Sequence, residues 1–84
     1  KGALYSLTRS WAMEFAPHGI TVNLVAADVG SGTAAEDGGS ATPLGRPVTL
    51  PDVVDAVAFL AGPGSGMITG QEIIINGGFT LQGF

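Results

Sequence analysis

The first predicted element is a helix over about 1–16. Apolar side chains fall on one face of a 3.6-residue period, at Leu4, Leu7, Trp11 and Phe15. Pro17 and Gly19 mark its end, because proline resists continuation and glycine accepts the left-handed turn that often follows a helix. Its start lacks the usual Ser, Thr, Asp or Asn cap, and Lys1 stands there instead. Two explanations remain open: a frayed terminus of a small complete domain, or a longer protein cut within a helix.

Two β-rich runs predict strands. Over about 20–26, the run ITVNLVA alternates apolar and polar residues, and Val25 makes its second face partly apolar. Over about 71–76, the run QEIIIN contains three consecutive isoleucines, which is typical of a buried strand. A strand with two apolar faces belongs in a sheet covered on both sides, and such sheets are usually parallel α/β sheets.

A second helix is predicted over about 50–61. Thr49 and Asp52 have the spacing of a capping box, and Pro51 lies in the first turn. The apolar stripe that follows consists of Val53, Val54, Val57, Leu60 and Ala61. The connection over about 27–49 is rich in small and polar residues, and connections of this length are usually binding loops, lids or disorder. Residues 77–84 are a tail.

The order helix, strand, long loop, helix, strand predicts the α/β class. A strand–helix–strand unit of this length favours parallel strands joined by a right-handed crossover. Two strands alone leave open sheet edges and uncovered faces. We therefore expect residues 1–84 to be one incomplete domain, the end of a larger parallel sheet.

Composition narrows the possible functions. The net charge of −4, with three basic residues, argues against nucleic acid and against an anionic membrane surface, since both need a basic patch. No cysteine and one histidine predict no metal site. No apolar run reaches the roughly 18 residues of a membrane span. Charged residues make up 12%, about half the usual fraction, so we expect other protein to cover much of the surface. The lack of cysteine and of a leader pattern favours a cytoplasmic location.

Three blocks of the sequence resemble the C-terminal third of a short-chain dehydrogenase/reductase. KGALYSLTRSWAMEFAPHGITVN is similar to the family's long helix and following strand, PLGRPVTLPDVVDAVAFLAG to its small helix after the substrate loop, and MITGQEIIINGG to its closing strand. The resemblance covers nearly the whole chain. It implies the C-terminal part of a doubly wound Rossmann-type parallel sheet. It also implies an oxidoreductase that moves hydride between NAD or NADP and an alcohol or carbonyl.

The resemblance gives Lys1 the place of the lysine in the family's Tyr-x-x-x-Lys motif. In the family, this lysine lies one helical turn after the catalytic tyrosine, lowers the pKa of the phenol and holds the cofactor ribose. Lys1 is therefore the candidate catalytic residue and also a candidate cofactor-binding residue. The family's motif tyrosine and Gly-rich phosphate loop are not among these residues, so we expect the 84 residues alone to be inactive.

The resemblance places the segment after the first strand against the nicotinamide. The family's usual pattern there is Pro-Gly-x-Ile-x-Thr, and this sequence departs from it at several positions. By register Gly32 takes the place of the threonine, and by chemistry Thr33 does. Asp28 lacks the freedom of glycine at positive φ, so either the loop takes a variant path or cofactor affinity is impaired. The candidate cofactor-binding residues are Lys1, Ala27, Asp28, Val29, Gly30, Gly32 and Thr33.

The same segment also matches a dinucleotide-binding fingerprint, Gly30-x-Gly32-x-x-Ala35, after a predicted strand. Its glycines would let a helix N-terminus approach a pyrophosphate. The following AAEDGGSATP is a poor helix, and Asp52 opens a helix instead of ending a second strand. We therefore favour the nicotinamide-facing interpretation over a phosphate loop.

Several single residues have a structural and a functional interpretation. Asn23 lies in an apolar strand, and we expect it to satisfy backbone groups at the end of the sheet rather than to catalyse. Arg46 could reach a substrate carboxylate or phosphate, but we favour pairing with an acid of the chain. His18 is expected to be exposed. We assign Trp11 and Phe15 to a core or a subunit interface, and Phe79, Leu81 and Phe84 to a subunit interface.

Two hypotheses follow, from different classes. In the first, the chain is the C-terminal segment of an NAD- or NADP-dependent oxidoreductase. It works with the remainder of its parent domain on a small alcohol or carbonyl substrate, and the resemblance implies a homo-oligomer, a tetramer or dimer. In the second, it is a small non-catalytic α/β module that self-associates or binds a protein partner.

Overall fold

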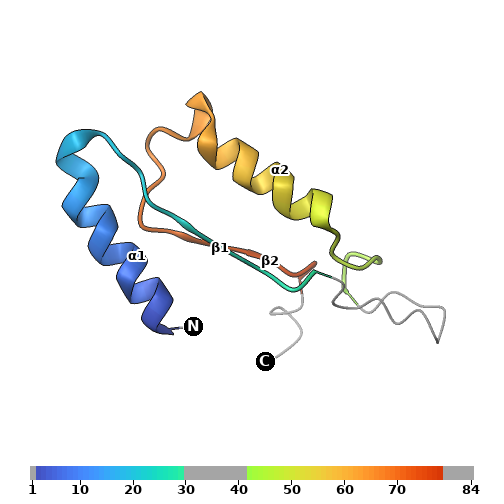
Figure 1. Ribbon diagram of the computed structural model, residues 1–84. Coiled ribbons are helices and arrows are strands. Elements are labelled where there is room, and N and C mark those ends of the chain that lie inside the picture. The colour runs from blue at the N-terminus through green and yellow to red at the C-terminus, as the bar shows by residue number, and fades with distance from the viewer. Residues whose placement is uncertain (1, 30–41, 79–84) are drawn as a thin grey trace.

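The computed structural model describes residues 2–29 and 42–78. These residues form two helices, two parallel strands and two short 3-10 turns (Figure 1). In chain order, the elements are α1 (Gly2–Phe15), η1 (Ala16–His18), β1 (Leu24–Ala27), α2 (Leu50–Ala61), η3 (Pro63–Ser65) and β2 (Glu72–Ile75). Strands β1 and β2 pair in parallel, with Leu24 opposite Glu72 and Ala27 opposite Ile75. The order and direction agree with the predicted α/β class.

The two helices lie on either side of the strand pair (Figure 1). Each helix leads into the next strand through a short connection, so each runs roughly antiparallel to the strands. As a result, the N-terminal ends of α1 and α2 both point toward the carboxyl ends of β1 and β2. This arrangement gathers two helix starts and two strand ends at one edge of the sheet.

Helix α1 packs through small residues rather than through its predicted apolar stripe. Thr8 and Ala12 are its buried residues. A Cβ added at Gly70 would lie 3.5 Å from the Cβ of Ala12, so the helix approaches this backbone closely. The stripe residues Leu4, Leu7 and Trp11 remain 53%, 41% and 46% exposed. Trp11 is therefore not part of the small core that the described residues form, and its predicted role in a core or a subunit interface completed by other protein stays a prediction.

Strand β1 begins at Leu24, four residues later than the sequence predicted, because the preceding residues bond to a turn instead of a strand. The Val22 N–H donates to Thr69 Oγ1 at 3.0 Å, and the Gly70 N–H donates to the Val22 carbonyl at 2.8 Å. Asn23 spans the same turn: its Nδ2 donates to the Ile68 carbonyl at 2.9 Å. Its Oδ1 accepts the N–H of residue 71 at 3.1 Å. The prediction that Asn23 satisfies backbone groups at the end of the sheet is confirmed.

Helix α2 covers the other side of the strands with much of its apolar surface still open. Val54, Val57 and Phe59 are about half exposed. Ala12 and Val48 are the buried hydrophobic residues of the described part of the chain. Neither described helix has the length and apolar character of a membrane span. Exposed apolar surface on both helices is the expected consequence of a two-stranded sheet, which has too few elements to enclose a core.

Candidate functional site

The candidate site lies at the carboxyl ends of β1 and β2. Open parallel sheets bind their ligands outside this edge, where strands give way to loops. Ala27 ends β1 opposite Ile75, and Asp28 and Val29 continue outward from it with exposed side chains. The start of α2 and the turn after β2 meet at the same edge. Elements far apart in the sequence therefore converge here.

The structure places only some of the predicted cofactor-binding residues. Ala27, Asp28 and Val29 are exposed at the carboxyl edge, with Ala27 as the last residue of β1 rather than the first of the loop. Four other candidates lie outside the described residues, namely Lys1, Gly30, Gly32 and Thr33. The neighbour of Lys1, Gly2, begins α1 at the helix end that points toward this edge. Phe79, Leu81 and Phe84 also lie outside the described residues.

A turn at residues 42–45 forms the other wall of the site. The Gly45 N–H donates to the Thr42 carbonyl at 2.9 Å and closes the turn. The Leu44 N–H donates to the Gly77 carbonyl at 3.1 Å, which fixes the turn against the residues that follow β2. Thr42 is buried. The long connection between β1 and α2 therefore returns to the sheet before α2 begins.

Gly77 is required where the turn meets the sheet. Its φ is +64°, a left-handed conformation that favours glycine. A Cβ added there would lie 2.6 Å from the Cβ of Thr42, which is too close for any side chain. The sequence predicted only that residues 77 and 78 end the strand. The contact with Thr42 joins residues 35 positions apart, so local sequence patterns carry no signal for it.

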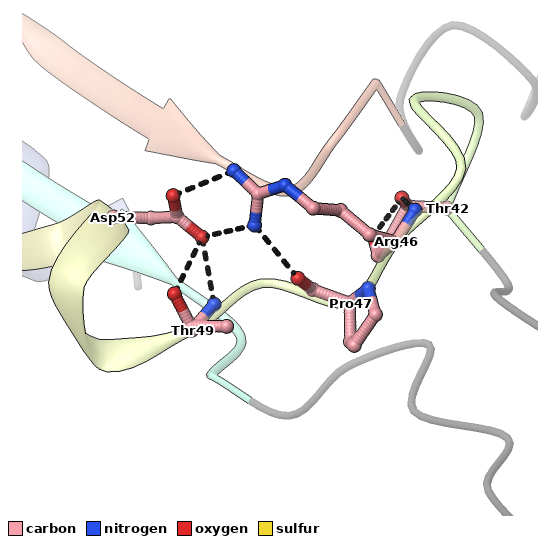
Figure 2. Close-up of polar contacts among 5 residues, drawn as sticks. All are labelled: Thr42, Arg46, Pro47, Thr49 and Asp52. Carbon is pink, nitrogen blue, oxygen red and sulfur yellow. Dashed lines mark hydrogen bonds and ion pairs between the residues drawn. The ribbon is translucent and has the colours of Figure 1, made fainter.

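An ion pair links this wall to α2 (Figure 2). Nη1 and Nη2 of Arg46 each lie 2.8 Å from an oxygen of the Asp52 carboxylate. Nη1 also donates to the Pro47 carbonyl at 3.1 Å. The hydrogen bonds from Arg46 hold the pKa of Asp52 well below its usual range, and Asp52 in turn raises the pKa of Arg46. The prediction that Arg46 pairs with an acid of the chain is confirmed.

Asp52 also caps its own helix, as the capping-box spacing predicted. Its Oδ2 accepts the Thr49 N–H at 2.8 Å and the Thr49 hydroxyl at 2.9 Å (Figure 2). These two bonds lower the pKa of Asp52 further. One carboxylate therefore ties the start of α2 both to its N-cap residue and to the arginine before it.

The volume of a hollow does not by itself locate the candidate site. A hollow of about 250 Å³ lies at the carboxyl edge and is lined by Leu44, Arg46, Asp52, Ile75 and Gly77. A larger one, of about 510 Å³, lies between α1 and the turn before β2, at the opposite end of the strands. We place the site at the smaller hollow, because the carboxyl edge is where the exposed strand ends and the helix N-terminus converge. Among residues 2–29 and 42–78, no cluster of three or more His, Asp and Glu side chains could hold a metal.

Comparisons with known proteins converge on one family. The family described as enoyl-(acyl carrier protein) reductase matches residues 1–80. A tropinone reductase homolog from Arabidopsis thaliana is 45% identical over the whole chain, which covers 36% of that protein. A 1-cyclohexenylcarbonyl-CoA reductase from Streptomyces collinus is 36% identical over 96% of the chain, which covers 33% of that protein. The chain thus spans about a third of the length of the curated relatives that it matches.

Solved structures agree with these relatives. A short-chain dehydrogenase/reductase from Serratia marcescens matches 95% of the chain with a TM-score of 0.77 and 35% identity, and the chain covers 32% of it. An oxidoreductase described as putative, from Escherichia coli, matches 95% of the chain with a TM-score of 0.79 and 35% identity, and the chain again covers 32%. The predicted fold class is confirmed: the parallel strands and their two helices are part of a Rossmann-type sheet.

The relatives also carry residues that this chain lacks. Their alignments with the whole 84-residue chain run over 94 positions, so about ten positions of each relative have no counterpart here. Insertions and deletions usually fall in connections between elements.

Proposed function

Because the chain belongs to the short-chain dehydrogenase/reductase family, we propose that it forms the C-terminal part of an NAD- or NADP-dependent oxidoreductase. The whole protein would move hydride between the nicotinamide and a small alcohol or carbonyl substrate. One observation carries the proposal. The family match extends over 80 of the 84 residues. We propose a cytoplasmic location on the composition alone.

The residues at the carboxyl edge fit a dinucleotide in part. Ala27 is small and exposed, so it leaves room for a flat ring to approach the end of β1. Asp28 is also exposed there, and its carboxylate would face the nicotinamide side of the cofactor. We assign the cofactor-facing role to Ala27, Asp28 and Val29, continuing through Gly30, Gly32 and Thr33. When bound, NAD or NADP supplies the group that accepts or donates hydride.

We assign to Lys1 the support of the reaction's acid/base group. An ammonium next to a phenol favours the phenolate and so lowers the pKa of a tyrosine one helical turn earlier. The same ammonium can donate hydrogen bonds to ribose hydroxyls. That tyrosine would come from a part of the protein that precedes this chain, so the 84 residues alone are proposed to be inactive.

The exposed apolar face of α1 supports an oligomer or burial within the parent domain. Leu4, Leu7 and Trp11 lie on one helix face and are about half exposed, and such faces usually contact other protein. The same observation favours a second candidate function, a non-catalytic module that self-associates or binds a protein. The two candidates differ in what precedes Lys1 in the gene.

Sequencing the gene upstream of Lys1 tests the proposal first. We expect a Tyr-x-x-x stretch directly before Lys1 and a Gly-rich strand–helix turn further upstream. The full-length protein should then oxidise NADH or NADPH in the presence of a panel of small ketones and aldehydes. A gene without these motifs, or a full-length protein that neither binds nor oxidises either nucleotide, would favour the non-catalytic module.

Replacing Lys1 in the full-length protein tests its assigned role. Lys1→Met removes the ammonium while keeping an unbranched side chain, and we expect kcat/KM to fall by about 100-fold, the lower end of what acid/base assistance contributes. The matched control is Arg9→Gln, which removes a positive charge from an exposed position of α1 and should leave kcat/KM unchanged. Equal losses in both variants would assign the effect to net charge rather than to Lys1.

A further inference from the structure

The contacts of Arg46 extend beyond Asp52 to the wall of the site. Thr42 Oγ1 donates to the Arg46 carbonyl, and the Arg46 N–H donates to Thr42 Oγ1 at 3.3 Å. Thr42 in turn packs against Gly77, where no side chain would fit. The backbone of Arg46 therefore holds the turn at residues 42–45, while its side chain holds the first turn of α2. Arg46 is the residue at which these two sets of contacts meet.

The guanidinium of Arg46 is already paired within the chain, although its side chain is 61% exposed. Both of its terminal nitrogens contact Asp52 at 2.8 Å, and one of them also contacts the Pro47 carbonyl. Two-pronged pairs of this kind fix geometry as well as charge. A substrate carboxylate or phosphate could not form the same two-pronged pair with Nη1 and Nη2 unless it displaced Asp52. The geometry therefore argues for an indirect role in binding.

The hollow at the carboxyl edge is where such a role would act. Leu44 of the turn, Gly77 after β2 and Arg46 itself line it. If the ion pair broke, the turn would lose one of its two attachments and could shift relative to Gly77. The shape of this wall would then vary, while the end of β1, with Ala27 and Asp28, would stay in place.

We propose that Arg46 is a positioning residue for the oxidoreductase reaction. Through Asp52, it fixes the turn at residues 42–45 against Gly77 and thereby sets the substrate wall of the site. The inference rests on the proposed function, because it concerns the same carboxyl edge.

The test uses the full-length protein that carries this chain. Arg46→Gln, Asp52→Asn and the double variant are compared with the charge control Arg9→Gln. We expect Arg46→Gln to raise KM for the carbonyl substrate about tenfold and to change kcat less than twofold, since chemistry is untouched and only binding geometry loosens. The double variant should be no worse than Arg46→Gln, because the two residues act as one unit. Arg46→Lys keeps the charge but loses the two-pronged geometry, and it replaces Arg46→Gln if that variant does not fold.

Hydrogen exchange gives a readout that does not need activity. The amides of Leu44, Gly45 and Arg46 all donate within or from the turn, so they should exchange about tenfold faster in Arg46→Gln. A KM within twofold of the wild-type value would overturn the positioning role, even if the melting temperature fell. Unchanged exchange at these amides would overturn it as well. Failure of the proposed function looks different, because the unmodified protein would then oxidise no NADH or NADPH.

Discussion

The two ends of the strand pair are held by different chemistry. At the amino ends, neutral groups of Val22, Asn23 and Thr69 bond to backbone across the chain. At the carboxyl ends, the Arg46–Asp52 ion pair and the contact between Thr42 and Gly77 hold the residues before α2 against those that follow β2. The amino end is therefore held by neutral hydrogen bonds to a turn, whereas the carboxyl end, where Ala27 and Asp28 are exposed, is held by an ion pair and a close packing contact.

The two ends of the strand pair therefore differ in the kind of interaction that holds them. Hydrogen bonds between part-buried neutral groups are insensitive to salt and fix the register of the strands. An exposed ion pair contributes less to stability, but it can hold a wall in place without covering the site. Each end should therefore respond to its own kind of substitution, and the variants below, made in the full-length protein, test this in order of expected effect.

The largest effect is expected at Gly77. Gly77→Ala adds a Cβ 2.6 Å from that of Thr42 in a left-handed conformation. We expect a loss of about 2–3 kcal/mol in the free energy of unfolding, from strain and overpacking together. Gly19→Ala is the matched control, since Gly19 has a φ of +72° but no atom within 4 Å of an added Cβ. Denaturant titration should show that Gly19→Ala costs about 1 kcal/mol. Equal losses would mean that the turn does not press on Gly77.

The next largest effect on stability is expected at Asn23, and it can be compared with that at Asn76 near the other end of the strands. Asn23→Ala leaves the Ile68 carbonyl and the N–H of residue 71 without their partner, and we expect a loss of about 2 kcal/mol. Asn76, after β2, accepts the N–H of Gly78, two residues further along, at 3.0 Å. Asn76→Ala should therefore cost about 0.5–1 kcal/mol. A larger loss for Asn76→Ala, measured by thermal or denaturant unfolding, would reverse the assignment of the rigid end.

The features that sequence predicted are those with local signals. The spacing of Thr49 and Asp52 gave the start of α2, and the polar Asn23 within an apolar run indicated a backbone-bonding role. Arg46 was correctly assigned to an ion pair, because an acid stands six residues further along. The α/β class followed from the order of the elements.

The features that sequence missed depend on contacts between distant segments. The apolar stripe of α1 gave no sign that, within the described residues, the helix packs through Thr8 and Ala12 close to the Gly70 backbone. β1 begins late because residues 20–23 bond to a turn near residue 70. The contact of Thr42 with Gly77 also joins two segments that are distant in the sequence. In each case, the deciding neighbour lies more than 30 residues away.

A smaller effect is expected at the N-cap of α2. Thr49→Ala removes the hydroxyl that donates to Asp52 at 2.9 Å, and N-cap replacements of this kind cost about 1 kcal/mol. Thr49→Ser keeps the hydroxyl and should remain within about 0.3 kcal/mol of the unmodified protein. Thermal unfolding of both variants measures the difference. Equal destabilisation would show that the methyl group of Thr49, rather than its hydroxyl, matters.

The smallest effect is expected in the pH dependence of the stability that Asp52 contributes. The folded-state pKa of Asp52 lies below its unfolded value of about 4, chiefly because Arg46 donates to the carboxylate. A depressed pKa means that the folded state binds fewer protons, so the contribution of Asp52 to stability is complete above about pH 4 and declines as the pH falls below it. The difference in melting temperature between the unmodified protein and Asp52→Asn should therefore be constant from pH 7 to about 5 and shrink below about 4. Asp55→Asn removes the same charge from the same helix and is the control. A difference that grew as the pH fell would mean that Asp52 is held in its protonated form, and the ion pair could not then fix the wall of the site.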